Sequence, residues 1–467
     1  MFSPQTYQER RQALMHNVKH GLIVLRGNSA LPMNYQANHF SFVQDASFRY
    51  CTGLTQPDLW LILDCDTGQE CLCGPEIQLM DTVWSGPRPC VEDLAASCGL
   101  ALSGNYAHLQ ARCSTALKHG QRVHYLPQYQ AEGQVQLADL LDQNIQDIRH
   151  NVSLSLISAL VALRSIKTPE EIAELRSAIA LSASVYALLM QTCRPGIEEQ
   201  HLYAQVVAHI VEHGCQEAFP TILSVRGETL HNHAHTNTLR PGDLLLIDSG
   251  TVSPNGYASD ITRTLPVSGT FSSLQRDIYS LVVRAQRSAI ACLRPSVPFV
   301  DAHIQAARVL ATGLCDLGFM RGDPAEAVAV GAHALFFPHG LGHMLGLDAH
   351  DMEALGEDFV GYDTVFQRST QFGLSGLRMA KPVQAGNVLT IEPGIYFIPA
   401  LISQWQANNM HTDFINYDLI NSAIGFGGIR LEDDILVTEY GVEILSTAIP
   451  LAANDIEQHM SDSRLEP

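Results

Sequence analysis

Two acidic residues flank a predicted hairpin in the middle of the chain. The run LLLIDSGTVSPNGYASDITRT, residues 244–264, places two strand-like segments around a turn at Ser-Pro-Asn-Gly. If the hairpin folds symmetrically about Pro254, Asp248 faces Asp260, and facing Cβ atoms lie only about 4.5–5.5 Å apart. Two carboxylates that close repel each other unless a cation lies between them. This pair alone leaves an alternative open: Asp248 ends a strand and Asp260 is a solvated turn residue.

Three histidines follow in the glycine-rich segment FFPHGLGHMLGLDAHD, residues 336–351. They are His339, His343 and His350. Neutral imidazole is the commonest metal ligand among side chains, and glycine allows the backbone to approach a ligand closely. The segment therefore favours a binding site over three ordinary core histidines.

Two glutamates lie within apolar strand-like runs, Glu392 in VLTIEPGIY and Glu432 in GGIRLEDDILV. Glutamate is rarely buried unless it is paired or bound to a metal. On the second run Arg430, Glu432 and Asp434 share one face by the two-residue period of a strand. An Arg430–Glu432 ion pair would explain that strand, but Glu392 has no basic residue in its run.

Together these segments supply four carboxylates and one imidazole, from Asp248, Asp260, His343, Glu392 and Glu432. Two divalent cations would neutralise the four negative charges. Oxygen-rich donors with a single histidine favour Mn²⁺, with Zn²⁺, Co²⁺ and Fe²⁺ as alternatives. Such a pair of ions activates water and polarises a carbonyl group, which is the chemistry of hydrolysis.

The elements that must position these residues follow a small N-terminal domain. The first 150 residues alternate helical and strand patterns, with a helix expected over 4–18 and strands over 21–27 and 58–65. This alternation predicts an α/β domain.

A second domain begins sharply at Thr168-Pro169-Glu170-Glu171, where threonine can cap a helix, proline suits its first position and Glu171 closes a capping box. We predict an N-terminal domain over 1–160, a catalytic domain over 161–455 and a tail over 456–467. The residues after Ala453 are expected to be disordered.

The second domain shows two helical patterns followed by strand patterns, and this order occurs twice. The helix-like segments are residues 172–189, 202–210, 274–293 and 300–314, and the later strand-like segments include 387–392 and 429–438. Two such halves predict a core with pseudo-twofold symmetry and a site where the halves meet.

Composition excludes several classes of protein. The 467 residues include 46% hydrophobic ones, which excludes a disordered chain, and 48 acidic against 28 basic residues argue against nucleic acid as a partner. Eleven scattered cysteines without a CxxC pair indicate reduced thiols. Because no uninterrupted apolar run reaches the ~18 residues that span a bilayer, we expect a cytoplasmic protein without membrane partners.

The spaced motifs DSG, ASDITRT, HGLGH, TIEPGIYF and GIRLEDD resemble those of the pita-bread metallopeptidases, specifically the prolidase and aminopeptidase P group, which cleave the bond before proline. HFSFVQDASFRYCTGLTQPD and RSIKTPEEI extend the resemblance over nearly the whole chain. It implies an α/β N-terminal domain of the aminopeptidase P type, an α+β pita-bread (creatinase/aminopeptidase-like) catalytic domain, and a homodimer or homotetramer.

The resemblance also implies roles for the metal-ligating residues. Asp248 and Asp260 would be ligands, with Asp260 bridging two ions; His343 and Glu392 would complete one ion, and Glu432 would bridge both. Glu392 would also carry the proton from the attacking water to the proline nitrogen. One departure is visible: Asp248 and Asp260 lie one residue further apart than the family pattern, so the insertion enlarges the turn between them.

Other residues would bind substrate. His231, in LHNHAH, matches a mobile substrate-binding histidine, while His339 and His350 match histidines that stabilise the tetrahedral intermediate and orient substrate. Arg430 would also bind substrate, and Arg430 and Thr262 would support the ligands from behind.

The length of the substrate is the remaining choice. Arg378, in GLRMAKPVQAG, occupies the place of an arginine that binds the carboxylate of a dipeptide in prolidases, and the long FINYDLINSAIGFGG stretch is also prolidase-like. We therefore predict an Xaa-Pro dipeptidase, with an aminopeptidase P acting on longer peptides as the alternative; Arg378 could also be a surface cation. A non-catalytic peptide-binding member and a creatine-type hydrolase are disfavoured, because members of those kinds lack metal ligands that this chain keeps.

Overall fold

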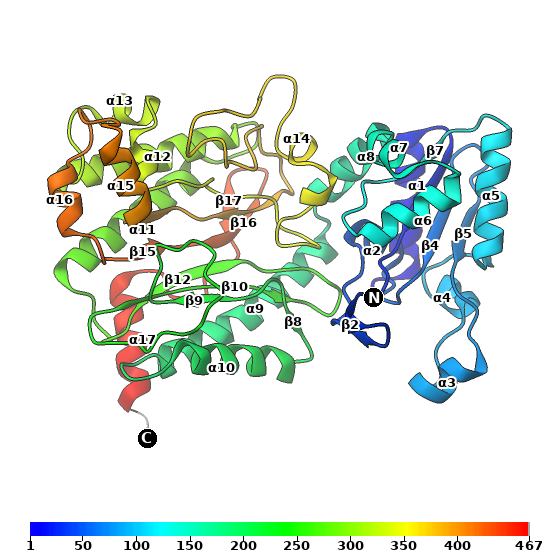
Figure 1. Cartoon of the computed structure of the whole chain (residues 1–467), viewed down its shortest axis with the longest axis horizontal. Helices are drawn as coiled ribbons and strands as arrows, with labels where there is room; N and C mark the ends of the chain where they lie inside the picture. The colour runs from blue at the N-terminus through cyan, green and yellow to red at the C-terminus, as the bar shows by residue number, and fades with distance from the viewer. Residues whose placement is uncertain (466–467) are drawn as a thin grey trace. The chain divides into compact units, whose positions relative to one another are not determined.

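The computed structural model describes residues 1–465 and divides into two compact units (Figure 1). Unit 1 comprises Met1–Arg164 together with Met352–Phe359. Unit 2 comprises Ser165–Asp351 and the described chain from Val360 onward. The segment 352–359 thus clusters with unit 1, a feature that the sequence pattern did not indicate.

Unit 1 is built on a five-stranded sheet in the order β6-β5-β4-β1-β7. Its strands are β1 Leu22–Arg26, β2 Pro32–Tyr35, β3 Asn38–His39, β4 Trp60–Asp64, β5 Glu70–Cys73, β6 Ser103–Gly104 and β7 Val123–His124. Its helices are α1 Pro4–Val18, α2 Ala46–Thr52, α3 Leu79–Ser85, α4 Val91–Ser97, α5 Tyr106–Lys118, α6 Ala131–Leu141, α7 Ile145–His150 and α8 Leu154–Ser165. The expected helix over 4–18 and the strands over 21–27 and 58–65 are confirmed as α1, β1 and β4.

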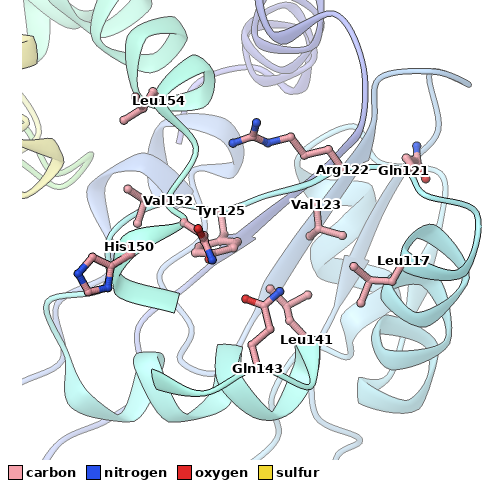
Figure 2. Close-up of a pocket in the computed structure, with 11 residues that line it drawn as sticks. Leu117, Gln121, Arg122, Val123, Tyr125, Leu141, Gln143, His150, Val152 and Leu154 are labelled. Carbon is pink, nitrogen blue, oxygen red and sulfur yellow. The ribbon is translucent and has the colours of Figure 1, made fainter. Parts of the chain in front are cut away.

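A cavity of about 560 Å³ lies beside β7 and α5 (Figure 2). Apolar side chains such as Leu117, Val123 and Leu141 line it together with the amides of Gln121 and Gln143. The eleven lining residues include no carboxylate and no cysteine. This lining does not offer the donor set of a hydrolytic metal centre.

Unit 2 repeats an order of two helices followed by strands, as expected. Its helices are α9 Pro169–Thr192, α10 Glu199–Glu212, α11 Ser273–Cys292, α12 Phe299–Asp316, α13 Pro324–Ala329, α15 Pro399–Ala407, α16 Tyr417–Ser422 and α17 Ala453–Leu465, with a 3₁₀ turn η1 at Ala332–Leu335. Two short elements, η2 Glu353–Leu355 and α14 Glu357–Val360, occupy the segment that returns to unit 1.

The strands of unit 2 form small antiparallel sheets in the orders β12-β10-β9, β11-β8, β13-β16-β17 and β14-β15. They are β8 Gln216–Glu217, β9 Ile222–Ser224, β10 Leu244–Ser249, β11 Thr251–Val252, β12 Ile261–Pro266, β13 Val388–Ile391, β14 Gly394–Tyr396, β15 Gly428–Arg430, β16 Asp433–Val437 and β17 Val442–Ile444. In Figure 1, β10 and β12 lie between the α9–α10 pair and the α11–α12 pair.

Helix α9 begins as the sequence predicts. The Thr168 side chain accepts a hydrogen bond from the Glu171 backbone N–H, the Glu171 carboxylate accepts one from the Thr168 backbone N–H, and Pro169 occupies the first turn. By length and apolarity alone α9 could cross a membrane. One face of the helix, which includes Leu175 and Leu189, is instead buried inside unit 2, so α9 contributes to the core.

The expectation of disorder after Ala453 is wrong for the described part of the tail. Residues 453–465 form helix α17, in which Ile456 and Met460 are fully buried. The helix packs against α9 and α11. Two apolar residues four positions apart give the tail one face to bury, which its high polarity concealed. Residues 466–467 of the predicted tail lie outside the described chain.

The register of the first hairpin also differs from the prediction. Asp248 pairs with Thr262 and does not face Asp260, and the bridge between Val252 and Ala258 keeps the same register. The hairpin is therefore centred on Asn255, one residue later than expected. The side-chain alternation is unchanged, so both aspartates still project from the same face.

Candidate metal centre and active site

The structure brings the five predicted metal ligands into one cluster. Three overlapping groups each place their ligand atoms within 4.8 Å of one another: Asp248, Asp260 and Glu432; His343, Glu392 and Glu432; and Asp260, His343 and His350. Asp248, Asp260, His343 and Glu432 are each less than 10% exposed. The side chain of Glu392 is 19% exposed. The cluster is thus buried with one partly accessible carboxylate.

Both halves of unit 2 supply this cluster. Asp248 comes from β10, and Asp260 directly precedes β12. Glu392 follows β13, and Glu432 lies between β15 and β16. The Glu432 N–H donates to the Thr262 carbonyl at 3.0 Å, which joins the two sheets at the site.

Strand β13 holds the histidine segment against the cluster. The Thr390 N–H donates to the His343 carbonyl at 3.0 Å, and the Glu392 N–H donates to Leu341 at 2.7 Å. A Cβ atom at Gly342 would lie 2.0 Å from the Thr390 carbonyl oxygen, so glycine is required at this close approach. The Gly-rich motif therefore seats His343 directly on β13.

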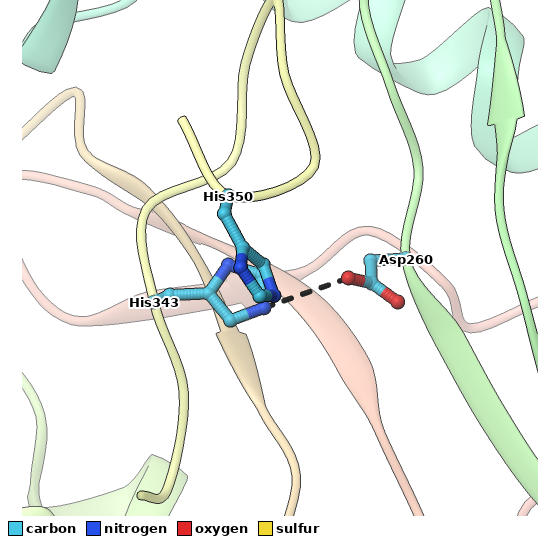
Figure 3. A group of neighbouring side chains, drawn as sticks. All are labelled: Asp260, His343 and His350. Carbon is cyan, nitrogen blue, oxygen red and sulfur yellow. Dashed lines mark ion pairs between the residues drawn. The ribbon is translucent and has the colours of Figure 1, made fainter. Parts of the chain in front are cut away.

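His343 and His350 lie side by side near Asp260 (Figure 3). His343 Nε2 is 3.5 Å from Asp260 Oδ2, and the two imidazole centroids are 4.2 Å apart. Burial, followed by the neighbouring His343, lowers the pKa of His350 to about 2, so its ring is neutral at physiological pH. His350, predicted from the resemblance to contact substrate, thus lies at the edge of the metal-ligating cluster.

The charge balance of the cluster fits a divalent cation. Burial and mutual repulsion raise the pKa values of Asp260 and Glu432 well above their usual range. Burial also raises the pKa of Glu392 to about 7, although His343 and Arg430 oppose this shift. The buried Asp248 Oδ1 has no hydrogen-bond partner among the described residues. Carboxylate oxygens held together in this way are suited to metal ions.

Arg430 supports the cluster from behind, as the resemblance implies. Its Nη2 is 2.6 Å from Asp248 Oδ2, and its Nε donates to Thr262 Oγ1 at 3.2 Å. The Thr262 hydroxyl in turn donates to Glu432 Oε2 at 2.7 Å. The simple explanation of an Arg430–Glu432 ion pair is therefore replaced by an indirect contact through Thr262.

Two residues near the cluster had no predicted role. Tyr396 Oη is 2.8 Å from His339 Nε2 and accepts a hydrogen bond from Arg430 at 3.2 Å, while the Asp434 carboxylate accepts one from the Asp260 N–H at 3.2 Å. Asp434 was noticed on the Arg430 face, but the sequence pattern did not indicate what it contacts.

Tyr396 and His339 restrain each other. A Cβ at Gly394 would lie 2.5 Å from the Tyr396 hydroxyl, and one at Gly428 would lie 2.5 Å from its ring. In the sequence, the glycines of EPGIY and FGG, which leave room for Tyr396 in the fold, were the signal that could have pointed to this tyrosine. Since His339 Nδ1 is 2.8 Å from the Gly340 carbonyl, it carries the proton and Nε2 accepts from tyrosine.

His231 and Arg378 reach the same electrostatic environment. Partial burial and the positive charge of Arg430 lower the pKa of His231, whereas Asp248 raises it. The charge of Arg378 contributes to lowering the pKa values of His231 and His350. Both residues are therefore within electrostatic range of the site, and their roles in binding substrate stay predictions.

Comparison with known families agrees with this geometry. Residues 173–439 match the model of metallopeptidase family M24, and residues 7–125 match the aminopeptidase P N-terminal domain. A probable Xaa-Pro aminopeptidase of Fusarium vanettenii is 32% identical over 92% of this chain and 89% of its own length. The Xaa-Pro aminopeptidase of Escherichia coli is 29% identical over 99% of both chains.

The human Xaa-Pro dipeptidase is 29% identical over 94% of this chain and 88% of its own. Solved structures of Escherichia coli aminopeptidase P, one with the inhibitor Pro-Leu and one zinc-substituted with product, match with a TM-score of 0.81 at 28% identity. The first covers 99% and the second 100% of both chains. The predicted α/β N-terminal domain and α+β pita-bread catalytic domain are thus confirmed, and the chain belongs to metallopeptidase family M24.

Proposed function

We propose that this metallopeptidase hydrolyses the peptide bond that precedes proline, using two divalent ions with Mn²⁺ as the first choice. The observation that carries the metal chemistry is the buried cluster of four carboxylates and one imidazole, in which an Asp248 oxygen lacks a partner. The preference for proline is supported by the Xaa-Pro names of relatives that span nearly the whole chain.

The predicted ligands, Asp248, Asp260, His343, Glu392 and Glu432, would hold the ions. When bound, divalent ions polarise the scissile carbonyl and lower the pKa of a water molecule. Measuring the metal content of the purified enzyme, followed by reloading with Mn²⁺, Zn²⁺, Co²⁺ or Fe²⁺, tests the choice of ion. Higher hydrolysis rates with another ion than with Mn²⁺ would contradict the first choice.

Glu392 is the residue best placed to move the proton. Its carboxylate is partly accessible and lies beside the other predicted ligands, so it can accept a proton from water and release it to the leaving proline nitrogen. His339 Nδ1 lies 3.8 Å from Glu392 Oε2. Because Tyr396 and Gly340 hold the His339 ring, this imidazole is kept beside the reacting carboxylate.

For substrate length, the comparisons favour an Xaa-Pro aminopeptidase over the dipeptidase predicted from Arg378. The Escherichia coli aminopeptidase P structures cover practically the entire chain, and Xaa-Pro aminopeptidases recur among the relatives. Dipeptidase remains the second candidate, because the charge of Arg378 reaches the site and the human dipeptidase is similarly close.

One experiment separates these activities. The Mn²⁺-loaded enzyme is incubated with an Xaa-Pro dipeptide and with the matching Xaa-Pro-Yaa tripeptide, and the two kcat/KM values are compared. Faster cleavage of the tripeptide supports the aminopeptidase, and faster cleavage of the dipeptide supports the dipeptidase. Failure to cleave either peptide, with Ala-Ala dipeptides cleaved instead, would contradict the preference for proline.

We also propose that the chain forms a homodimer or homotetramer in the cytoplasm. Helix α3 has no buried residue, and its Leu79, Val83 and Trp84 side chains are 80%, 65% and 81% exposed. Apolar clusters of this kind are typical of association surfaces. Light scattering after size exclusion measures the assembly, and Trp84→Ser should weaken it if α3 takes part. The scattered cysteines without a CxxC pair support the reducing compartment.

A further inference from the structure

We propose that a buried ion pair between Lys167 and Asp351 positions His350. The Lys167 Nζ and Asp351 Oδ2 atoms are 3.0 Å apart, and each side chain is only 1% exposed. Asp351 directly follows His350, so the pair fixes the backbone next to the imidazole. The inference rests on the proposed function, in which His350 orients the substrate.

The lysine end of the pair is anchored to the strands behind the site. Lys167 donates its backbone N–H to the Gly386 carbonyl at 2.9 Å, and Gly386 donates to the Val437 carbonyl at 2.8 Å. Val437 ends β16, and β13 begins at Val388, two residues after Gly386. Both strands lead to residues of the metal-ligating cluster, so Lys167 is held in a frame shared with Glu392.

At the other end of the ion pair, Asp351 forms hydrogen bonds with other residues of its own loop. Asp351 donates its N–H to the Met344 carbonyl at 2.9 Å, and its Oδ1 accepts from the Asp348 N–H at 3.4 Å. A Cβ atom at Gly346 would lie 2.4 Å from Asp351 Oδ2. The loop 344–351 therefore wraps around one carboxylate, and the glycine leaves the space that the carboxylate occupies.

The same loop is attached to both metal-bearing segments. Leu345 donates to the Val388 carbonyl at 3.0 Å, and the Gly346 carbonyl accepts from the Ala258 N–H at 2.8 Å, two residues before Asp260. His343 precedes the loop and His350 lies at its end (Figure 3). Lys167 holds the end of the loop that carries His350, whereas β13 and Ala258 hold its beginning.

A buried ion pair is a costly way to stabilise a fold. The free energy needed to remove two charges from water offsets much of their attraction. Well-packed apolar residues in the same place often stabilise a protein equally. A single directional contact, however, selects one geometry for the groups attached to it. This specificity is what the Lys167–Asp351 pair adds to a histidine that must meet substrate.

The test uses the double variant Lys167→Met with Asp351→Asn in the full-length, metal-loaded enzyme. Asparagine keeps the Oδ1 acceptor for Asp348, and methionine fills the space of the lysine, so no charge is left unpaired. We expect a melting temperature near that of the wild type but kcat/KM on an Xaa-Pro peptide lowered about 10- to 100-fold, because small displacements of an orienting group have effects of this size. Hydrogen exchange of amides 345–351 should become faster.

A kinetic cycle with His350→Ala distinguishes positioning from general destabilisation. If the pair acts through His350, adding the double variant to His350→Ala lowers kcat/KM little further. Glu70→Gln, which removes the negative charge from the partly buried Arg11–Glu70 ion pair of unit 1, is the matched control and should give independent, multiplicative effects. Multiplicative losses for the Lys167–Asp351 variant, or a wild-type kcat/KM, would overturn the inference.

The proposed function fails differently. If the wild type cleaves no Xaa-Pro peptide, the function is wrong before any variant is compared. If the wild type is active and His350→Ala is impaired, the cycle reports on the ion pair alone. Should the double variant fold poorly, Asp351→Asn alone is measured in the same cycle, with hydrogen exchange reporting the fraction folded.

Discussion

Neighbouring acids on one strand segment have opposite surroundings. Asp433 forms a buried ion pair with Arg263, whose Nη2 is 2.7 Å away, and it also accepts from Ser446 Oγ at 2.6 Å. Arg263 is fully buried and donates further to backbone carbonyls, including that of Glu432 at 2.7 Å. On this side of the segment, the charge of Asp433 is balanced by groups of the protein itself.

Glu432, the preceding residue, points to the other side. There the carboxylates of Asp248, Asp260, Glu392 and Glu432 outnumber the positive charge of Arg430, and two buried oxygens, Asp248 Oδ1 and Asp434 Oδ1, lack partners among the described residues. Alternation along the strand thus separates a structural pair from a cluster that requires cations from outside. Burial of an acid therefore indicates a ligand only when its charge is not balanced within the chain.

Removing Glu392 is the most direct test of the difference between the two sides of this segment. Glu392→Ala should lower kcat on an Xaa-Pro peptide by at least about 10²–10⁴-fold, because the proposed proton-transfer group and metal ligand would be lost together. Circular dichroism should show the fold retained, since the substitution also relieves repulsion among the carboxylates. Substantial activity in this variant would contradict the assignment of the metal centre.

We expect the opposite result for Asp433, whose charge is balanced within the protein. Asp433→Asn leaves the buried Arg263 charge unpaired, which costs about 3–5 kcal/mol of unfolding free energy. Activity per folded molecule should fall much less than in Glu392→Ala. Denaturant unfolding measures the first effect and active-site-normalised kinetics the second; an unchanged stability would mean that this pair is no more balanced than the cluster.

Particular residues show how far the sequence alone could lead. The cluster ligands were identifiable because their motifs lie in apolar strands, where a carboxylate demands an explanation. The facing of Asp248 and Asp260 was predicted wrongly, because the centre of the turn depends on which residues close it. Tyr396 was missed, since its role arises from a contact with His339, 57 residues away in the sequence.

The helix α17 and the Lys167–Asp351 pair illustrate the same limit. Local polarity suggested a disordered tail, but packing against α9 and α11 stabilises a helix there. The partners Lys167 and Asp351 are 184 residues apart, and neither carries a local signal of pairing. Periodicity and capping predict elements, whereas long-range contacts between polar side chains depend on the folded geometry.

Removing the metal should reveal the unbalanced charge through its pH dependence. The pKa of Glu392 is raised from its usual 4.5 to about 7. Its contribution to stability is therefore fully present below pH 4.5 and is lost as the pH rises through about 7.

Metal-free protein should accordingly lose melting temperature across that interval, while metal-loaded protein loses less, because the ions stabilise the charged carboxylates. Calorimetry with and without a chelator, at matched ionic strength, gives the difference in melting temperature at each pH. A difference that shrinks as the pH rises would contradict an unbalanced cluster.

The smallest expected effect concerns Arg378, a cation whose charge acts to lower the pKa of Asp260 in the cluster. If it binds the carboxylate of a dipeptide, Arg378→Ala should lower kcat/KM for an Xaa-Pro dipeptide by about 10- to 150-fold, the equivalent of one charged hydrogen bond, and affect the tripeptide less. Arg284→Ala, at an exposed position on α11, is the matched control for loss of a positive charge. Equal losses on both peptides would place Arg378 among the charges that tune the cluster and would remove the remaining support for a dipeptidase. A selective loss would instead show that a cation at the rim of an acidic site can measure substrate length, because the metals already neutralise the carboxylates that would otherwise compete for it.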